Sequence, residues 1–204
     1  MEKRYDFKRD LLNVHKPGLR DFSRKPGNDE FVVCDGMAVV VPEGADKVIM
    51  NAVRDFESFL FISMKTSAFV TENDGEYAKK LVISLNKDIE EASGYMGYRI
   101  KICDTGITLE GYDNRGVAQG LYFLEDLMSV RRAPYLKKQT IKRKSIFDRR
   151  TTQSSFGMFE WTDEALAHIA HMGMNCISLW IKDVNLDKRG GFLDINLLVE
   201  RCEK

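Results

Sequence analysis

Two apolar segments near the end of the chain are each followed by a pair of charged residues. The pairs are Arg149 with Arg150, and Lys182 with Asp183. A helical pattern separates the two segments, and the order strand, helix, strand is typical of a right-handed βαβ unit with parallel strands. In an α/β barrel the C-terminal ends of the parallel strands face the active site. The sequence therefore predicts that these four side chains lie at the rim of a binding site.

The adjacent acids Asp163 and Glu164 are further candidates for chemistry in this region. They follow Thr162, a typical N-cap residue, and acidic side chains in the first turn of a helix interact favourably with its dipole. We therefore expect both acids to stabilise the start of a helix, and we expect no catalytic residue in the chain.

His168 and His171 lie three residues apart on the same expected helix. Zinc ligands on one helix typically form an HExxH motif or are combined with nearby cysteines, and this stretch has neither. We interpret the two residues as surface histidines, and we expect neither a metal site nor a cofactor.

The elements that must position these residues occupy 145–204. The runs at 145–148 and 174–181 are the expected strands, and Gly173 is expected to end the helix between them. A complete (β/α)₈ barrel has about 250 residues, with about 200 at the low end. We therefore expect 145–204 to be the incomplete βαβ start of a TIM barrel.

Residues 30–130 show the pattern of an accessory α+β domain. The expected strands are 31–34, 37–41, 66–70, 80–85, 98–102 and 107–111, with hairpin turns at Asp35-Gly36 and Asp104-Thr105-Gly106. The expected helices carry Ile49, Val53, Phe56 and Leu60, and Val117, Leu121, Leu124 and Met128, each set along one face. The predicted fold class is α+β: a mixed sheet with two helices on one face, followed by a partial (β/α) barrel start.

Gly116 and Gly120 lie four residues apart on the second of these helices. Since a glycine costs about 1 kcal/mol in a helix interior, two of them predict close packing against the sheet. A phosphate-binding loop would need the GxGxxG spacing or a Walker lysine, and the segment has neither.

The flanking segments are polar. Residues 1–29 are expected to be a lead-in, and 131–144 a basic linker. The run of lysine and arginine that continues to Arg150 would suit nucleic acid. However, the formal net charge is +0 and no aromatic residues alternate with the basic ones, so we interpret the run as a solvated connector.

The composition bears on the cellular compartment in which the protein is expected. The 204 residues are 44% hydrophobic, enough for a sizeable core, and the four cysteines form no CxxC pair, which favours free thiols in a reducing compartment. The first residues contain no apolar signal-peptide core, and no run approaches the roughly 18 apolar residues of a membrane span. A cytoplasmic location is favoured, with no nucleic acid or membrane as partner.

Two stretches resemble parts of glycoside hydrolases. The stretch 106–128, GITLEGYDNRGVAQGLYFLEDLM, is similar to the non-catalytic domain that precedes the barrel in family 20 hexosaminidases, and to related domains of family 84 hexosaminidases and α-glucuronidases. The stretch 173–183, GMNCISLWIKD, resembles a barrel strand of family 84. Residues 148–152, DRRTT, depart from the Arg-Gly of family 20 and the EGFYG loop of family 84, and keep only the arginine.

The resemblance implies an N-terminal part of a carbohydrate-active hydrolase that acts on an oligosaccharide or glycoside. It also implies that Arg149 or Arg150, with Lys182 and Asp183, would contact sugar. In these families the acidic pair that cleaves the glycosidic bond follows the fourth barrel strand. The chain itself is therefore expected to be inactive.

A second hypothesis is a stand-alone carbohydrate-binding or protein-interaction module. It requires the last helix to cover the βαβ unit without a barrel. In either case an open βαβ unit exposes strand edges, so we also expect self-association through this part of the chain.

Overall fold

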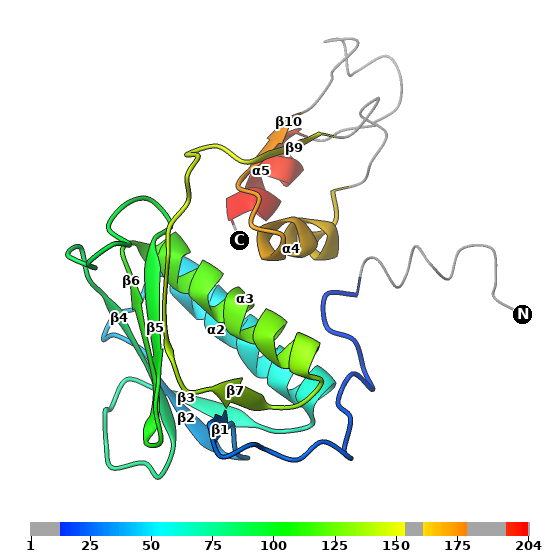
Figure 1. The fold of residues 1–204 in the computed structure, drawn as a ribbon. Helices are drawn as coiled ribbons and strands as arrows, with labels where there is room; N and C mark the ends of the chain where they lie inside the picture. Colours follow the sequence, from blue (N-terminus) through cyan, green and yellow to red (C-terminus); the bar gives the residue numbers. More distant parts are fainter. Residues whose placement is uncertain (1–12, 154–160, 179–194, 204) are drawn as a thin grey trace, which may run out of the picture. The chain divides into compact units, whose positions relative to one another are not determined.

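A computed structural model describes residues 13–153, 161–178 and 195–203 of the chain (Figure 1). It divides into two compact units: His15–Ile146, and Met1–Val14 together with Phe147–Lys204. Among the described residues, no helix combines the length and the apolar character that crossing a membrane requires.

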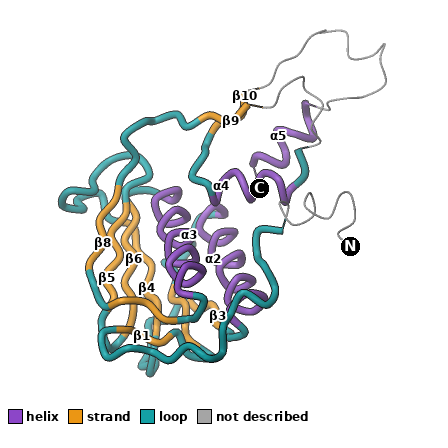
Figure 2. Tube along the Cα trace, turned by 45° about the vertical axis from the view of Figure 1, so that its right-hand side comes forward, coloured by secondary structure: helices purple, strands orange, loops and turns teal. Residues whose placement is uncertain are grey.

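The unit His15–Ile146 is built on a six-stranded mixed sheet with the order β3-β2-β4-β6-β5-β8 (Figure 2). β2, β3, β4 and β6 are parallel, and β5 is antiparallel to both of its neighbours. The strands are β2 (Met37–Val40), β3 (Ala68–Thr71), β4 (Lys80–Leu85), β5 (Tyr98–Ile102), β6 (Gly106–Gly111) and β8 (Thr140–Arg143). The expected hairpin of β5 and β6 is confirmed, with Ile100 opposite Leu109.

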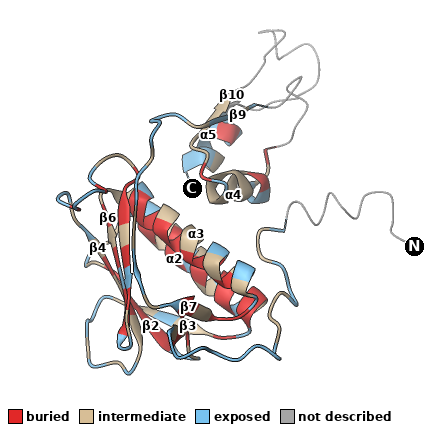
Figure 3. Ribbon diagram, viewed as in Figure 1, coloured by how far each residue is buried: buried red, intermediate tan, exposed pale blue. Residues whose placement is uncertain are grey.

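Two helices, α2 (Lys47–Phe59) and α3 (Asn114–Arg131), lie side by side on one face of this sheet (Figures 1 and 2). Their sheet-facing sides are buried (Figure 3). Each of the apolar residues that the sequence placed on the inner faces is fully buried: Ile49, Val53, Phe56, Leu60, Val117, Leu121, Leu124 and Met128. The predicted mixed sheet with two helices on one face is confirmed.

Helix α2 does not end at Phe59 but widens into one turn of π-helix, η1 (Leu60–Met64). Lys65 then adopts a left-handed conformation, with φ of 52°. The guanidinium of Arg20 donates hydrogen bonds to the backbone oxygens of Met64, at 2.7 Å, and Lys65, at 3.2 Å. The carbonyls that a helix end leaves unpaired are thus satisfied by a side chain from the N-terminal segment.

Helix α3 approaches the sheet so closely that two of its positions exclude a side chain. A Cβ at Gly116 would lie 2.2 Å from the carbonyl oxygen of Gly97, and one at Gly120 would lie 2.4 Å from Cδ1 of Leu109. The carboxylate of Asp113 caps the helix by accepting from the amide of Gly116 at 2.7 Å. The close packing predicted from the two glycines is confirmed.

The prediction of a hairpin at Asp35-Gly36 is wrong. β1 (Glu30–Val32) pairs with β7 (Tyr135–Lys137) in a separate antiparallel sheet, whereas β2 enters the main sheet. Asp35 instead accepts hydrogen bonds from the amide and hydroxyl of Ser67, at 2.8 and 2.6 Å. The turn therefore joins two sheets instead of two neighbouring strands.

The segment 131–144 was expected to be a linker, but it contains β7 and β8, which are paired with β1 and β5. Arg131 also forms an ion pair with the nearly buried carboxylate of Glu30, at 2.6 Å. The described part of the lead-in is tied down as well, since the amide of Asp21 donates to the carbonyl of Arg132 at 2.8 Å. Residues 15–29 and 131–144 therefore belong to this unit.

In the second unit, β9 (Thr151–Gln153), α4 (Asp163–His171) and β10 (Cys176–Ser178) are followed by α5 (Ile195–Glu203). The strand expected at 145–148 is absent: no strand is assigned there, and its apolar residues Ile146 and Phe147 are 89% and 68% exposed. The first strand of the βαβ unit starts at Thr151 instead.

The glycine contacts predict an order of sensitivity along α3. Gly116→Ala should lower the free energy of unfolding by about 2–3 kcal/mol, because backbone faces the added methyl group and must move. Gly120→Ala should cost less, because the side chain of Leu109 can rotate away. Urea unfolding measures both.

Val130→Ala, at an 87% exposed position of the same helix, is the matched control and should change stability by less than about 0.5 kcal/mol. Equal stability of the wild-type protein and the Gly116→Ala variant would contradict the close approach.

Candidate functional site

β9 and β10 lie side by side as a two-stranded parallel sheet, with α4 between them in the sequence. The register pairs Thr151 with Cys176 and Gln153 with Ser178. Gln153 and Ser178 are the last residues of the two strands and therefore mark the C-terminal edge of this sheet. A parallel pair joined through a helix is the βαβ unit that the sequence predicted.

Helix α4 is positioned by its two ends. The Thr162 hydroxyl accepts a hydrogen bond from the amide of Ala165 at 3.2 Å, so the predicted N-cap is confirmed. Gly173 follows the helix with φ of 79°, a conformation that favours glycine, and its amide donates to the carbonyl of Ala170. From α5, Arg201 donates to the carbonyl of Trp161 at 2.8 Å and pairs with Asp163 at 3.5 Å.

Asn175 holds the starts of the two strands together. Its side-chain oxygen accepts from the amide of Arg150 at 2.8 Å, and its side-chain nitrogen donates to the carbonyl of Asp148 at 2.8 Å. Its own amide donates to the carbonyl of Arg150 at 3.0 Å. The side-chain amide group of Asn175 thus pairs with the backbone along 148–150, before the regular hydrogen bonds between β9 and β10 begin.

The arginine pair lies at the opposite end of β9 from the one expected. Arg149 is exposed and Arg150 half-buried, and both precede Thr151, the first residue of the strand. They therefore stand at its N-terminal end, whereas barrel active sites form at C-terminal ends. Lys182 and Asp183 lie outside the described residues.

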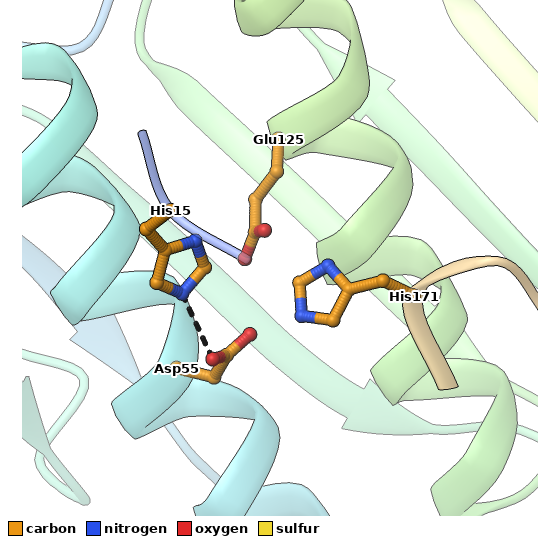
Figure 4. Close-up of side chains that lie close together, drawn as sticks. All are labelled: His15, Asp55, Glu125 and His171. Carbon is orange, nitrogen blue, oxygen red and sulfur yellow. Dashed lines mark hydrogen bonds and ion pairs between the residues drawn. The ribbon is translucent and has the colours of Figure 1, made fainter. Parts of the chain in front are cut away.

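A second group of polar residues lies within the first unit and was not predicted as a site. His15 from the N-terminal segment, Asp55 from α2 and Glu125 from α3 converge (Figure 4). The imidazole Nε2 of His15 lies 2.9 Å from Oδ1 of Asp55, and the ligand atoms of the three side chains all lie within 4.8 Å of one another. His171, also drawn in Figure 4, belongs to the second unit.

Glu125 is 3% exposed, which is unusual for a carboxyl group. Burial raises its pKa well above the ordinary value, and the negative charges of Asp55 and Asp126 raise it further. Burial also raises the pKa of the neighbouring Tyr122. One signal of this site was present in the sequence: Glu125 occupies a position of the apolar stripe, four residues after Leu121 and three before Met128.

Comparisons with known proteins connect this fold to glycoside hydrolases. A β-hexosaminidase of Streptomyces plicatus is similar over 78% of this chain and 32% of its own, with a TM-score of 0.61 and 16% identity. The protein described as CpGH84D is similar over 85% of this chain and 32% of its own, with a TM-score of 0.62 and 15% identity. A 4-O-methyl-α-glucuronidase of family GH115, BtGH115A, has a TM-score of 0.57 and 11% identity over 74% of this chain and 26% of its own.

No family model matches the chain, and no curated protein matches it significantly. The chain spans about a third of the length of the first structures that it resembles. At these identities the likeness establishes the fold: an α+β architecture shared with domains of glycoside hydrolases.

The hydrogen bonds of Asn175 predict that its replacement loosens β9 from β10. Asn175→Ala removes both side-chain bonds and leaves the amide of Arg150 and the carbonyl of Asp148 without this partner. The expected cost is about 1–3 kcal/mol. Faster amide hydrogen exchange at 151–153 and 176–178 would report it.

Gln153→Ala, at an exposed position of β9, is the control and should leave exchange nearly unchanged. Unchanged protection in the Asn175→Ala variant would show that Asn175 does not hold the strands together.

Proposed function

We propose that this chain is part of a carbohydrate-active hydrolase of the hexosaminidase or glucuronidase type. The observation that carries the proposal is the order of two structures along one chain. A six-stranded sheet covered by two helices is followed by a parallel βαβ unit, and the similar solved structures include a hexosaminidase and a glucuronidase. The Streptomyces plicatus enzyme was solved with the product GlcNAc, which supports a sugar as the substrate.

In this proposal the βαβ unit is the start of a barrel that continues in a longer protein. Glycoside hydrolysis requires a carboxylic acid that protonates the leaving oxygen and a second group that stabilises the oxocarbenium-like centre. We assign both groups to the continuing barrel. Asp163 is engaged with Arg201, and with Glu164 it occupies the first turn of α4, which fits a role in the helix start.

The sugar contacts are proposed at both charged pairs. Lys182 and Asp183 follow the C-terminal end of β10 in sequence, where barrel enzymes bind their substrates. Arg149 has an exposed side chain that could reach a sugar from the other end of the short strand β9, and Arg150 is half-buried beside it. The lysine and aspartate are therefore the stronger candidates.

The proposal predicts where activity resides. Residues 1–204 alone should release no 4-nitrophenol from 4-nitrophenyl N-acetyl-β-glucosaminide or 4-nitrophenyl glucuronide. A longer protein that continues with further βα repeats should hydrolyse one of them. Turnover by the 204-residue chain would contradict the assignment of the acids, and a coding sequence that stops after Lys204 would favour a stand-alone module.

Substitutions in the longer protein test the sugar contacts. Lys182→Ala and Asp183→Asn should each lower kcat/KM about 10–100-fold, the loss expected when a charge-assisted hydrogen bond of about 1.5–3 kcal/mol is removed. Arg149→Ala tests the arginine pair in the same assay.

Lys101→Ala, at an exposed position of β5, is the matched control and should leave kcat/KM unchanged. Wild-type kinetics in the Lys182→Ala and Asp183→Asn variants would remove these residues from the substrate site.

A further inference from the structure

The three side chains of His15, Asp55 and Glu125 form a potential ligand set that the proposed function does not use. They come from three separate segments of the same unit, and no two of them are local neighbours in sequence. Figure 4 shows the imidazole and the two carboxyl groups turned toward a common point between α2 and α3. One nitrogen and two carboxylates within 4.8 Å of one another can approach a single ion.

The charge balance of the cluster favours a cation. Two carboxyl groups lie close together, and that of Glu125 is buried. Placing a second negative charge beside a buried one is costly unless a proton or a cation compensates it. The imidazole of His15 contacts the carboxylate of Asp55 at 2.9 Å. A divalent ion would neutralise both carboxylates and bind an imidazole nitrogen of His15.

The kinds of ligand atom in the cluster indicate which ion it would bind. Mg²⁺ and Ca²⁺ prefer oxygen ligands alone, whereas Zn²⁺ binds imidazole nitrogen and carboxylate oxygen together. Zinc ligands at about 2.0–2.2 Å from the metal lie roughly 3.3–3.6 Å apart in a tetrahedron. Because the present ligand atoms lie up to 4.8 Å apart, binding requires the carboxyl groups of Asp55 and Glu125 to turn toward the ion. A water molecule would take the fourth position.

We propose that His15, Asp55 and Glu125 bind a divalent zinc-class ion that ties the N-terminal segment to α2 and α3. Such an ion would act on stability, because it joins three segments that are far apart in sequence. His15 already contacts α2 through Asp55 and through the ring of Phe59, at 5.7 Å between centroids. The ion would extend this attachment to α3, and the inference does not depend on the proposed function.

The experiment uses the 204-residue chain after treatment with a chelator. Zn²⁺ at about 100 times its dissociation constant should raise Tm by about 5–10 °C. His15→Ala and Glu125→Gln should abolish most of this rise. Without zinc, Glu125→Gln should melt at or above the wild-type temperature, because an uncharged amide of nearly the same shape replaces a buried carboxyl group. Glu125→Gln therefore decides the test if His15→Ala fails to fold.

Two matched controls test whether the rise is specific to the three proposed ligands. Glu57→Gln replaces another carboxyl group on α2 whose pKa is raised by burial, and His168→Ala replaces a histidine outside the three ligands; both should keep the full rise. X-ray absorption at the zinc edge should show nitrogen and oxygen at about 2.0–2.1 Å, not the roughly 2.3 Å of cysteine sulfur.

No rise in the wild-type protein, an equal rise in the Glu125→Gln variant, loss of the rise in a control, or sulfur ligands would each overturn the proposal.

Discussion

The packing of α3 on the sheet of the first unit depends on a close contact between two backbones. One is the start of α3, and the other is the loop that leads into β5. Gly116 lies against the carbonyl of Gly97, and the amide of Tyr112 donates to that same carbonyl at 2.8 Å. Asp113 joins the two backbones again, because its carboxylate accepts from the amides of both Gly116 and Met96. With this end of α3 fixed, the apolar stripe of the helix is aligned with β5 and β6, and α2 packs beside it.

In the second unit a side chain, that of Asn175, connects neighbouring elements, as a close backbone contact does in the first unit. β9 and β10 have three residues each, so their ladder alone contributes few hydrogen bonds. Asn175 lengthens the junction by two side-chain bonds, and Arg201 connects α5 to the beginning of α4. Among the described residues this sheet has two strands, which is the arrangement that the proposed barrel start requires.

Local signals in the sequence identified the elements whose partners are near in the chain. The stripe of α2, the cap and glycines of α3 and the hairpin of β5 with β6 depend on residues a few positions apart. The errors arose where the partner is distant. Asp35-Gly36 has the composition of a hairpin turn, but β1 pairs with β7 about a hundred residues later. The basic character of 131–144 concealed two strands, because Ile141 alone of the β8 side chains packs against the core and the pairing with β5 is made by the backbone.

The same difference between local and distant partners explains which candidate sites the sequence indicated and which it did not. Apolar residues at 145–148 suggested a strand that would end at the arginines, yet Ile146 and Phe147 are exposed and the ladder begins only at Thr151. His15, Asp55 and Glu125 carry no common motif, because three-dimensional packing alone brings them together. An acid inside an apolar stripe is nevertheless a readable signal, since burying a carboxyl group is unfavourable unless something compensates it. Glu125 could therefore have been recognised in the sequence as a residue whose burial needs compensation, although its neighbours His15 and Asp55 became apparent only in the fold.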